Sequence, residues 1–350
     1  MPALLINLIV FLVCCLLVQC SRESQKRKDC VLLVIATIQV LFCQTFKDVN
    51  LLPDIPDYVK AYQYICRDDA TYMQATYYYK MQYGYYLYNK ILSVFSDNPL
   101  YFTFVTGAVI SLPYIFFIKR YSPMVWLSLV IYMMSFIQSS FVLRQYTAMG
   151  LCIISFPMLF RRQYLRCLVL WLCAMAIHPT AIFFGFVYGF YFVRSTKLFV
   201  VISVVLLVGL IIFIPLLATL FVDNVAGYNA YLEGEKLEYS TTIIQFYILV
   251  LFWWFVWRKG NLSEELQLMG KLSVITFIVP LASTFSQMSG IVPRLLLYLT
   301  FVQYAVIPYI LLGIQTKKLR FFVLCSFLFL FFYLFYFSHN SRVEQFKLLF

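Results

Sequence analysis

The stretch at residues 142–183, VLRQYTAMGLCIISFPMLFRRQYLRCLVLWLCAMAIHPTAIF, decides how the rest of the chain is interpreted. It holds two long apolar runs, which are joined by the basic turn RRQYLR at residues 161–166. Arg144 opens the stretch and His178 closes it. Because basic loops stay on the cytoplasmic side of a membrane, we expect both ends of the stretch on the opposite face, within reach of each other. We interpret this pairing as the centre of an active site.

Apolar residues dominate the chain well beyond this stretch. Of the 350 residues, 63% are hydrophobic and only 12% are charged, whereas soluble proteins carry about a quarter charged residues. Apolar runs of about 20 residues between charged clusters are typical of transmembrane helices. No polar linker divides the chain. We therefore predict an all-α, polytopic integral membrane protein that forms a single transmembrane domain over residues 1–350.

About twelve transmembrane helices are expected, and some of them are short. Residues 165–177 cover about 20 Å as a helix, less than a hydrocarbon core of about 30 Å. Short or broken helices are tolerated where their ends line a water-filled cavity, so we expect a cavity that faces outward. The predicted spans are residues 3–19, 30–46, 99–118, 123–141, 146–160, 165–177, 180–193, 198–221, 240–257, 267–285, 295–313 and 321–337.

The distribution of charge predicts the orientation. With the N-terminus outside, most of the 27 lysines and arginines fall in cytoplasmic loops, and most of the 15 acidic residues fall outside. The net charge of +12 therefore reports membrane orientation, and no nucleic-acid partner is expected, because that would need a solvated basic face. Two outer loops are long, residues 47–98 and 222–239. Within the first, residues 69–95 predict an amphipathic helix or helix pair at the outer interface.

Two arginines contradict the inward bias of the others. Arg144 and Arg294 each stand at the outer end of a predicted helix. A guanidinium group can grip phosphate or carboxylate with two hydrogen bonds, so a pair of them suits a pyrophosphate. The alternative is that each arginine reaches from its helix end to lipid phosphates.

His178 and Asp57 are the other candidates for chemistry. An imidazole can take a proton from a hydroxyl near neutral pH, although His178 could instead be satisfied by a backbone carbonyl in a helix break. Asp57 could act as a base, bind sugar hydroxyls or be a solvated loop residue. Tyr58 and Tyr62 could stack on sugar faces or belong to the aromatic belt at the membrane surface. A lone carboxylate predicts no metal site.

Common catalytic motifs are missing from the sequence. There is no GxGxxG, phosphate-binding GKS or GKT loop, HExxH or GxSxG pattern. No soluble domain is present that could bind a nucleotide sugar, and no cofactor is indicated. An outward-facing enzyme of this kind would need a donor carried by a lipid.

These residues together resemble the EpsG family, a branch of the Wzy-like polysaccharide polymerases. One position departs from the family pattern, because residues 81–83 read MQY where a glutamate is expected shortly before the Gly-Tyr pair. The resemblance covers about residues 30–315. The matching pieces are Asp57-Tyr58 with Tyr62, Gly84-Tyr85, RQYTA at residues 144–148, HPTA at residues 178–181, and Arg294 with Tyr298 before a span that carries Pro308.

The resemblance implies a GT-C-like fold and a lipid-dependent glycosyltransferase. The enzyme would polymerise polyprenyl-pyrophosphate-linked oligosaccharide repeat units at the outer face of the bacterial inner membrane, as in capsule, exopolysaccharide or O-antigen biosynthesis. Chain-length regulator and flippase proteins would be its partners, besides membrane lipid. The expected catalytic residues are His178, Arg144, Arg294 and Asp57, and the expected substrate-binding residues are Gln145, Tyr58, Tyr62, Tyr85 and Tyr298.

Two other functions remain open from the sequence. A transferase or ligase that makes a single addition from the same lipid-linked donor would use the same residues. A transporter of lipid-linked oligosaccharide would need charged groups at mid-membrane and repeated halves, and neither is clear here. Product length separates a polymerase from a transferase.

Overall fold

The computed structural model describes residues 3–50, 52, 54–67, 69–224, 239–286, 292–338 and 346–348. Within these residues every secondary-structure element longer than a single bridge is a helix, which confirms the all-α prediction. The only β-type pairing among them is an isolated bridge between Lys47 and Leu348.

Five helices of the described chain are long and apolar enough to cross a membrane. They are α1 (Ala3–Cys20), α2 (Gln25–Thr45), α6 (Pro99–Tyr121), α13 (Glu264–Ser286) and α16 (Lys317–Tyr333). The other predicted spans coincide with helices that are shorter, less apolar, interrupted or described only in part. These helices indicate a membrane protein. The number of twelve spans stays a prediction.

The chain forms two compact units. The first contains Met1–Met158, Gln163–Ala181 and Gln315–Phe350, and the second contains Leu159–Arg162 and Ile182–Ile314. The single transmembrane domain over residues 1–350 stays a prediction.

Long apolar helices build one part of the first unit. Helix α2 packs against α1, α6 and α7 (Val125–Ser135), and α16 packs against α7. Helix α6 shows why these segments are helical. Pro99 takes its first position, and the Asn98 side chain accepts a hydrogen bond from the Leu100 N–H at 2.8 Å. Lys119 and Arg120 in its last turn complement the helix dipole.

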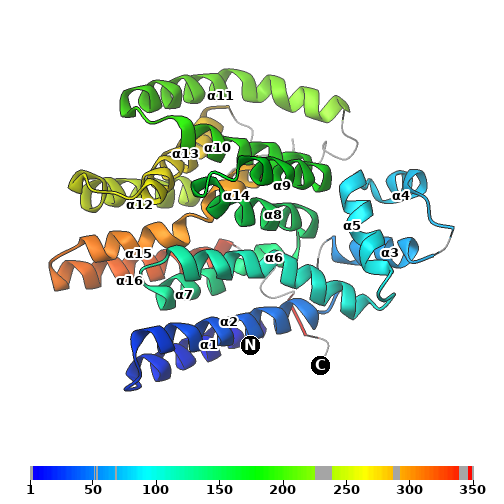
Figure 1. The fold of residues 1–350 in the computed structure, drawn as a ribbon, viewed down its shortest axis with the longest axis horizontal. Coiled ribbons are helices and arrows are strands. Elements are labelled where there is room, and N and C mark those ends of the chain that lie inside the picture. Colours follow the sequence, from blue (N-terminus) through cyan, green and yellow to red (C-terminus); the bar gives the residue numbers. More distant parts are fainter. Residues whose placement is uncertain are drawn as a thin grey trace. The chain divides into compact units, whose positions relative to one another are not determined.

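Three short helices of the predicted outer loop gather at one end of this unit (Figure 1). They are α3 (Ile55–Ile65), α4 (Tyr72–Tyr79) and α5 (Tyr83–Ser93). Helices α4 and α5 are the helix pair that residues 69–95 predict, and Lys80 separates them in a left-handed conformation with φ 48°. Helix α5 packs on both α3 and α9 (Tyr164–Ile177).

Helix breaks lie on both sides of α8 and α9, within and next to the stretch at residues 142–183. The predicted span at 123–141 is α7 followed by the 3-10 helix η1 (Phe136–Ser140), and α8 (Leu143–Phe160) follows it. After α9 the chain continues as the 3-10 helix η2 (Pro179–Phe184). The π-helical turn η5 (Leu334–Ser338) continues α16.

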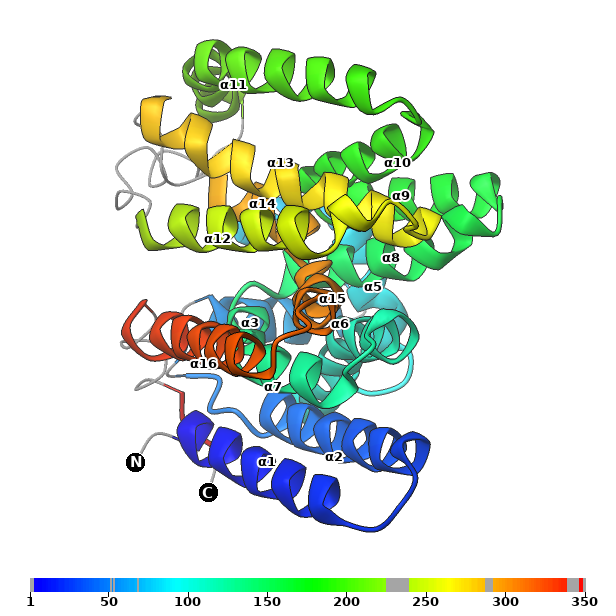
Figure 2. The same ribbon diagram turned by 90° about the vertical axis from the view of Figure 1, so that its left-hand side faces the viewer.

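Helix α13 is the centre of the second unit. It packs against α10 (Gly185–Phe192), α11 (Thr196–Asn224), α12 (Tyr239–Phe255), α14 (Val292–Thr300) and α15 (Gln303–Gly313). Figure 2 shows α13 lying between α11 and α12. The 3-10 turn η4 (Trp257–Lys259) follows α12. Of the predicted outer loop at 222–239, residues 225–238 lie outside the described residues.

Candidate functional site

Arg144 lies in the first turn of α8 and contacts two other elements. Its Nη1 donates to the Lys80 carbonyl oxygen at 2.8 Å and to Gln82 Oε1 at 3.2 Å. Its Cζ lies 5.4 Å from the centroid of the Tyr58 ring, a cation–π distance. The arginine therefore joins α3, the α4–α5 turn and the start of α8.

Tyrosine rings continue from Arg144 into the outer-loop helices. Tyr58 meets Tyr85 edge-on with centroids 6.0 Å apart, and Tyr85 stacks on Tyr88 at 5.8 Å. The Tyr85 side chain is fully buried. Burial raises the pKa of the Tyr85 phenol well above its usual value. This phenol stays neutral at physiological pH, so it does not neutralise the arginine.

The positive charge of Arg144 is not matched by a carboxylate in the part of the chain that the structure describes. The only ion pair there joins Arg27 to Glu23. Arg144 bonds a carbonyl and an amide instead, and Asp54 acts on it only at longer range. The Arg144 Nε is buried and finds no acceptor among the described residues. A partly buried cation without a counter-ion is unfavourable by itself and attracts an anion.

His178 ends α9 beside the same outer-loop helices. A Cβ added to Gly84 would lie 2.5 Å from the carbonyl carbon of Ala176, so α5 touches the backbone of α9 two residues before the histidine. The His178 side chain is buried, and its Nδ1 lies 2.6 Å from Thr180 Oγ1. The segment at residues 82–85 therefore contacts Arg144 through Gln82 and the end of α9 through Gly84.

The other predicted site residues lie in varied surroundings. Tyr62 stacks on Phe102 at 4.7 Å and donates to the Ser96 carbonyl, so it attaches α3 to α6. Gln145 is fully buried, whereas Asp57 is exposed in the first turn of α3. The structure thus brings Arg144, Tyr58 and Tyr85 together, whereas Tyr62 contacts Phe102 and Ser96 instead.

Two predicted residues belong to the second unit. Tyr298 is buried in α14. Arg294 lies in the same helix, and its side chain is outside the described residues. Their roles at the site stay predictions.

Lys47 is a buried group that the sequence reasoning did not assign. Its Nζ donates to Gln44 Oε1 and to the Ser140 carbonyl, each at 3.0 Å, and Gln44 Nε2 donates to Ser139 Oγ at 2.9 Å. Burial lowers the pKa of the Lys47 amine to about 7. These bonds hold η1, which ends four residues before Arg144. The sequence signal was weak, because a lysine after an apolar helix is ordinarily an exposed interface residue.

Acidic and thiol side chains do not cluster in the described residues. No group of three or more His, Cys, Asp or Glu side chains there could hold a metal ion.

The chain matches a known protein family. A family model described as the EpsG family matches residues 30–349, nearly the whole chain. No curated protein and no solved structure matches the chain.

Proposed function

Because the chain belongs to the EpsG family, we propose that it polymerises polyprenyl-pyrophosphate-linked oligosaccharide repeat units at the outer face of the bacterial inner membrane. Membership of this family indicates an exopolysaccharide polymerase-type role. The observation that supports the finer proposal is Arg144, a guanidinium with no carboxylate partner among the described residues, set beside Tyr58 and Tyr85. Such a group suits an anionic leaving group, and tyrosine rings suit sugars.

The reaction needs one bond to form and one to break. A hydroxyl of the incoming repeat unit attacks the anomeric carbon of the growing chain, and the bond between that carbon and the pyrophosphate oxygen breaks. The polyprenyl pyrophosphate leaves with the bonding electrons, and the hydroxyl proton passes to a base. Arg144 stabilises the negative charge that develops on the leaving oxygen, an effect worth several kcal/mol in preorganised sites. His178 or Asp57 is the base.

The test uses the purified full chain in lipid with lipid-linked repeat units. A ladder of products on a gel supports polymerisation. A single addition would assign the chain to a transferase or ligase instead, and no new glycosidic bond at all would overturn the proposal.

A matched pair of variants tests the role of the arginine. We expect Arg144→Gln to abolish the ladder. Arg161→Gln makes the same chemical change in an exposed turn and should leave the ladder intact. A ladder of normal length from Arg144→Gln would remove this residue from the mechanism.

A further inference from the structure

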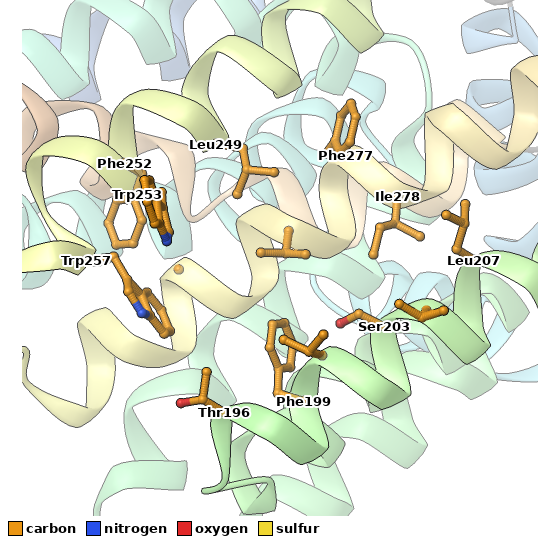
Figure 3. Close-up of a pocket in the computed structure, with 14 residues that line it drawn as sticks. Thr196, Phe199, Ser203, Leu207, Leu249, Phe252, Trp253, Trp257, Phe277 and Ile278 are labelled. Carbon is orange, nitrogen blue, oxygen red and sulfur yellow. The ribbon is translucent and has the colours of Figure 1, made fainter.

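The second unit contains an apolar cavity of about 380 Å³ between α11, α12 and α13. Figure 3 shows its lining side chains, with Thr196 and Trp257 toward one end and Leu207 and Ile278 toward the other. The polar atoms of its lining side chains are the hydroxyls of Thr196 and Ser203 and the indole nitrogens of Trp253 and Trp257. A cavity of this volume is within the range of small-molecule sites, and its mostly apolar lining favours an apolar ligand.

The length of the cavity matches one leaflet of a bilayer. Its lining on α11 runs from Thr196 to Leu207, which is about 16 Å along a helix with a rise of 1.5 Å per residue. A hydrocarbon core is about 30 Å thick. One lipid chain that enters from one face of the membrane would therefore extend along the whole cavity.

Gly270 shapes the wall near Trp257. A Cβ at this position would lie 2.5 Å from Phe252 Cε1 and 2.7 Å from Trp257 Cζ3. Because Gly270 has no side chain, the rings of Phe252 and Trp257 pack directly on the backbone of α13. The cavity next to these rings therefore stays open. Tryptophan at one end of an apolar cavity also fits the depth of the membrane interface.

Cations surround the same end of the cavity. Arg194 and Lys197 stand at the start of α11 next to Thr196, and Arg258 and Lys259 stand next to Trp257. All four are exposed, and none of them forms an ion pair within the described residues. Arg258 lies over the Trp254 ring at 4.5 Å, and Lys259 donates to the Gly313 carbonyl at 3.2 Å.

Acids at this end are fewer than the cations. Glu264 and Glu265 open α13, so the four cations leave an excess of positive charge. Basic residues at the membrane surface attract anionic lipid headgroups by about 1 kcal/mol each. The charge therefore complements a phosphate on the face of the basic loops.

We propose that this cavity binds an acyl chain of an anionic phospholipid, whose phosphate lies against Lys197 and Arg258. The lipid enters from the leaflet on the side of the basic loops, whereas the proposed reaction takes place on the opposite face. The occupant is for this reason a phospholipid rather than the polyprenyl chain of the substrate. The choice of a phospholipid over the polyprenyl chain rests on the proposed function, and the test measures lipid binding alone.

The experiment uses the full chain in nanodiscs with a photoactivatable acyl chain on phosphatidylglycerol, and on phosphatidylcholine as the neutral counterpart. We expect labelling of α11 and α13 by the phosphatidylglycerol probe. Unlabelled phosphatidylglycerol should compete for it at least about fivefold better than phosphatidylcholine, whose headgroup is zwitterionic. This is the ratio that the attraction of one cation for a net negative headgroup provides. Equal competition by the two lipids would overturn the proposal, and so would stronger competition by a polyprenyl phosphate.

Two variants on α11 provide a matched comparison. Val204 lines the cavity and Val201 does not, although both are exposed valines of the same helix. Val204→Trp should fill the cavity and reduce labelling at least fivefold, whereas Val201→Trp should label like the unmodified chain. Arg258→Gln should lower the preference for phosphatidylglycerol and leave labelling by phosphatidylcholine unchanged. Unchanged labelling of Val204→Trp would place the lipid elsewhere. The competition on the unmodified chain tests the proposal even if a variant fails to fold.

Discussion

Replacing Gly84 by alanine should separate α5 from α9 and disable the candidate site. The added Cβ would lie 2.5 Å from the carbonyl carbon of Ala176, 2.7 Å from its oxygen and 2.8 Å from its Cβ. Ordinary contact begins at 3.4 Å. The nearest atoms belong to the backbone of α9, so no side-chain rotation relieves the overlap, and α5 must withdraw by up to about 0.9 Å.

The size of the effect follows from this displacement. Overpacking of this kind costs about 1–3 kcal/mol of folding free energy, and the better helix propensity of alanine offsets at most about 1 kcal/mol of it. The same movement displaces Gln82 and Tyr85 relative to Arg144. Because a misplacement of about 1 Å can cost about 100-fold in rate, we expect the activity to fall more than the stability.

Two measurements decide the outcome: ladder formation in vitro and the thermal unfolding midpoint in detergent. Gly189→Ala is the matched control, because a Cβ there meets nothing within 4 Å. Adding Ala176→Gly to Gly84→Ala should restore only part of the activity, since it removes one of the three contacts and leaves the backbone ones. A normal ladder from Gly84→Ala, or full rescue by the second change, would refute the close approach of the two helices.

Three further predictions concern cations and their partners. Arg144→Lys should slow chain growth about 100-fold, because an ammonium keeps the charge but lacks the planar fork of the guanidinium. The control is Arg161→Lys, and the ladder assay measures chain growth in both variants. Tyr58→Leu should reduce activity more than Tyr58→Phe, which keeps the ring under the guanidinium; similar losses in the two variants would argue against the cation–π contact. For Lys47, burial puts the folded pKa at about 7, below the unfolded value of about 10.4. Between these values the unfolded chain binds more protons, so unfolding free energy should rise with pH from about 7 to 10 by up to about 1.4 kcal/mol per unit. Thermal unfolding of the unmodified chain should show this slope relative to Lys47→Met, and identical pH profiles would contradict it.

The sequence predicts helices well because apolar runs, proline, capping residues and basic turns are local signals. Helix α6 begins at Pro99 as its predicted span does, and the α4–α5 pair follows from the mixed pattern at residues 69–95. Helix α8 begins at Leu143, three residues before the predicted span at 146–160. These features depend on neighbours in the chain and so need no knowledge of packing.

The contacts that build the site could not be predicted in this way. Gln82 and Arg144 are 62 residues apart, and Lys47 and Ser140 are 93 apart. No periodicity marks such a pair in one sequence. Gly84 stands in a Gly-Tyr pair of the sequence, but only the fold shows why a glycine is needed there, because the backbone of Ala176 leaves no room for a Cβ. The number of spans also depends on packing, because a short helix crosses a membrane only where neighbouring helices pack around it.

Lys47 and Arg144 are two cationic side chains of the first unit that differ in whether they can lose their charge. Lys47 is fully enclosed, and its amine can lose its proton near neutral pH, so the fold is not forced to bury a charge there. A guanidinium cannot lose its proton in a protein, and Arg144 has only neutral acceptors within the described residues. The positive charge of Arg144 is therefore permanent, and no carboxylate forms an ion pair with it within the described residues. An anion that binds there would stabilise this charge, and a pyrophosphate leaving group would provide such an anion in the proposed reaction.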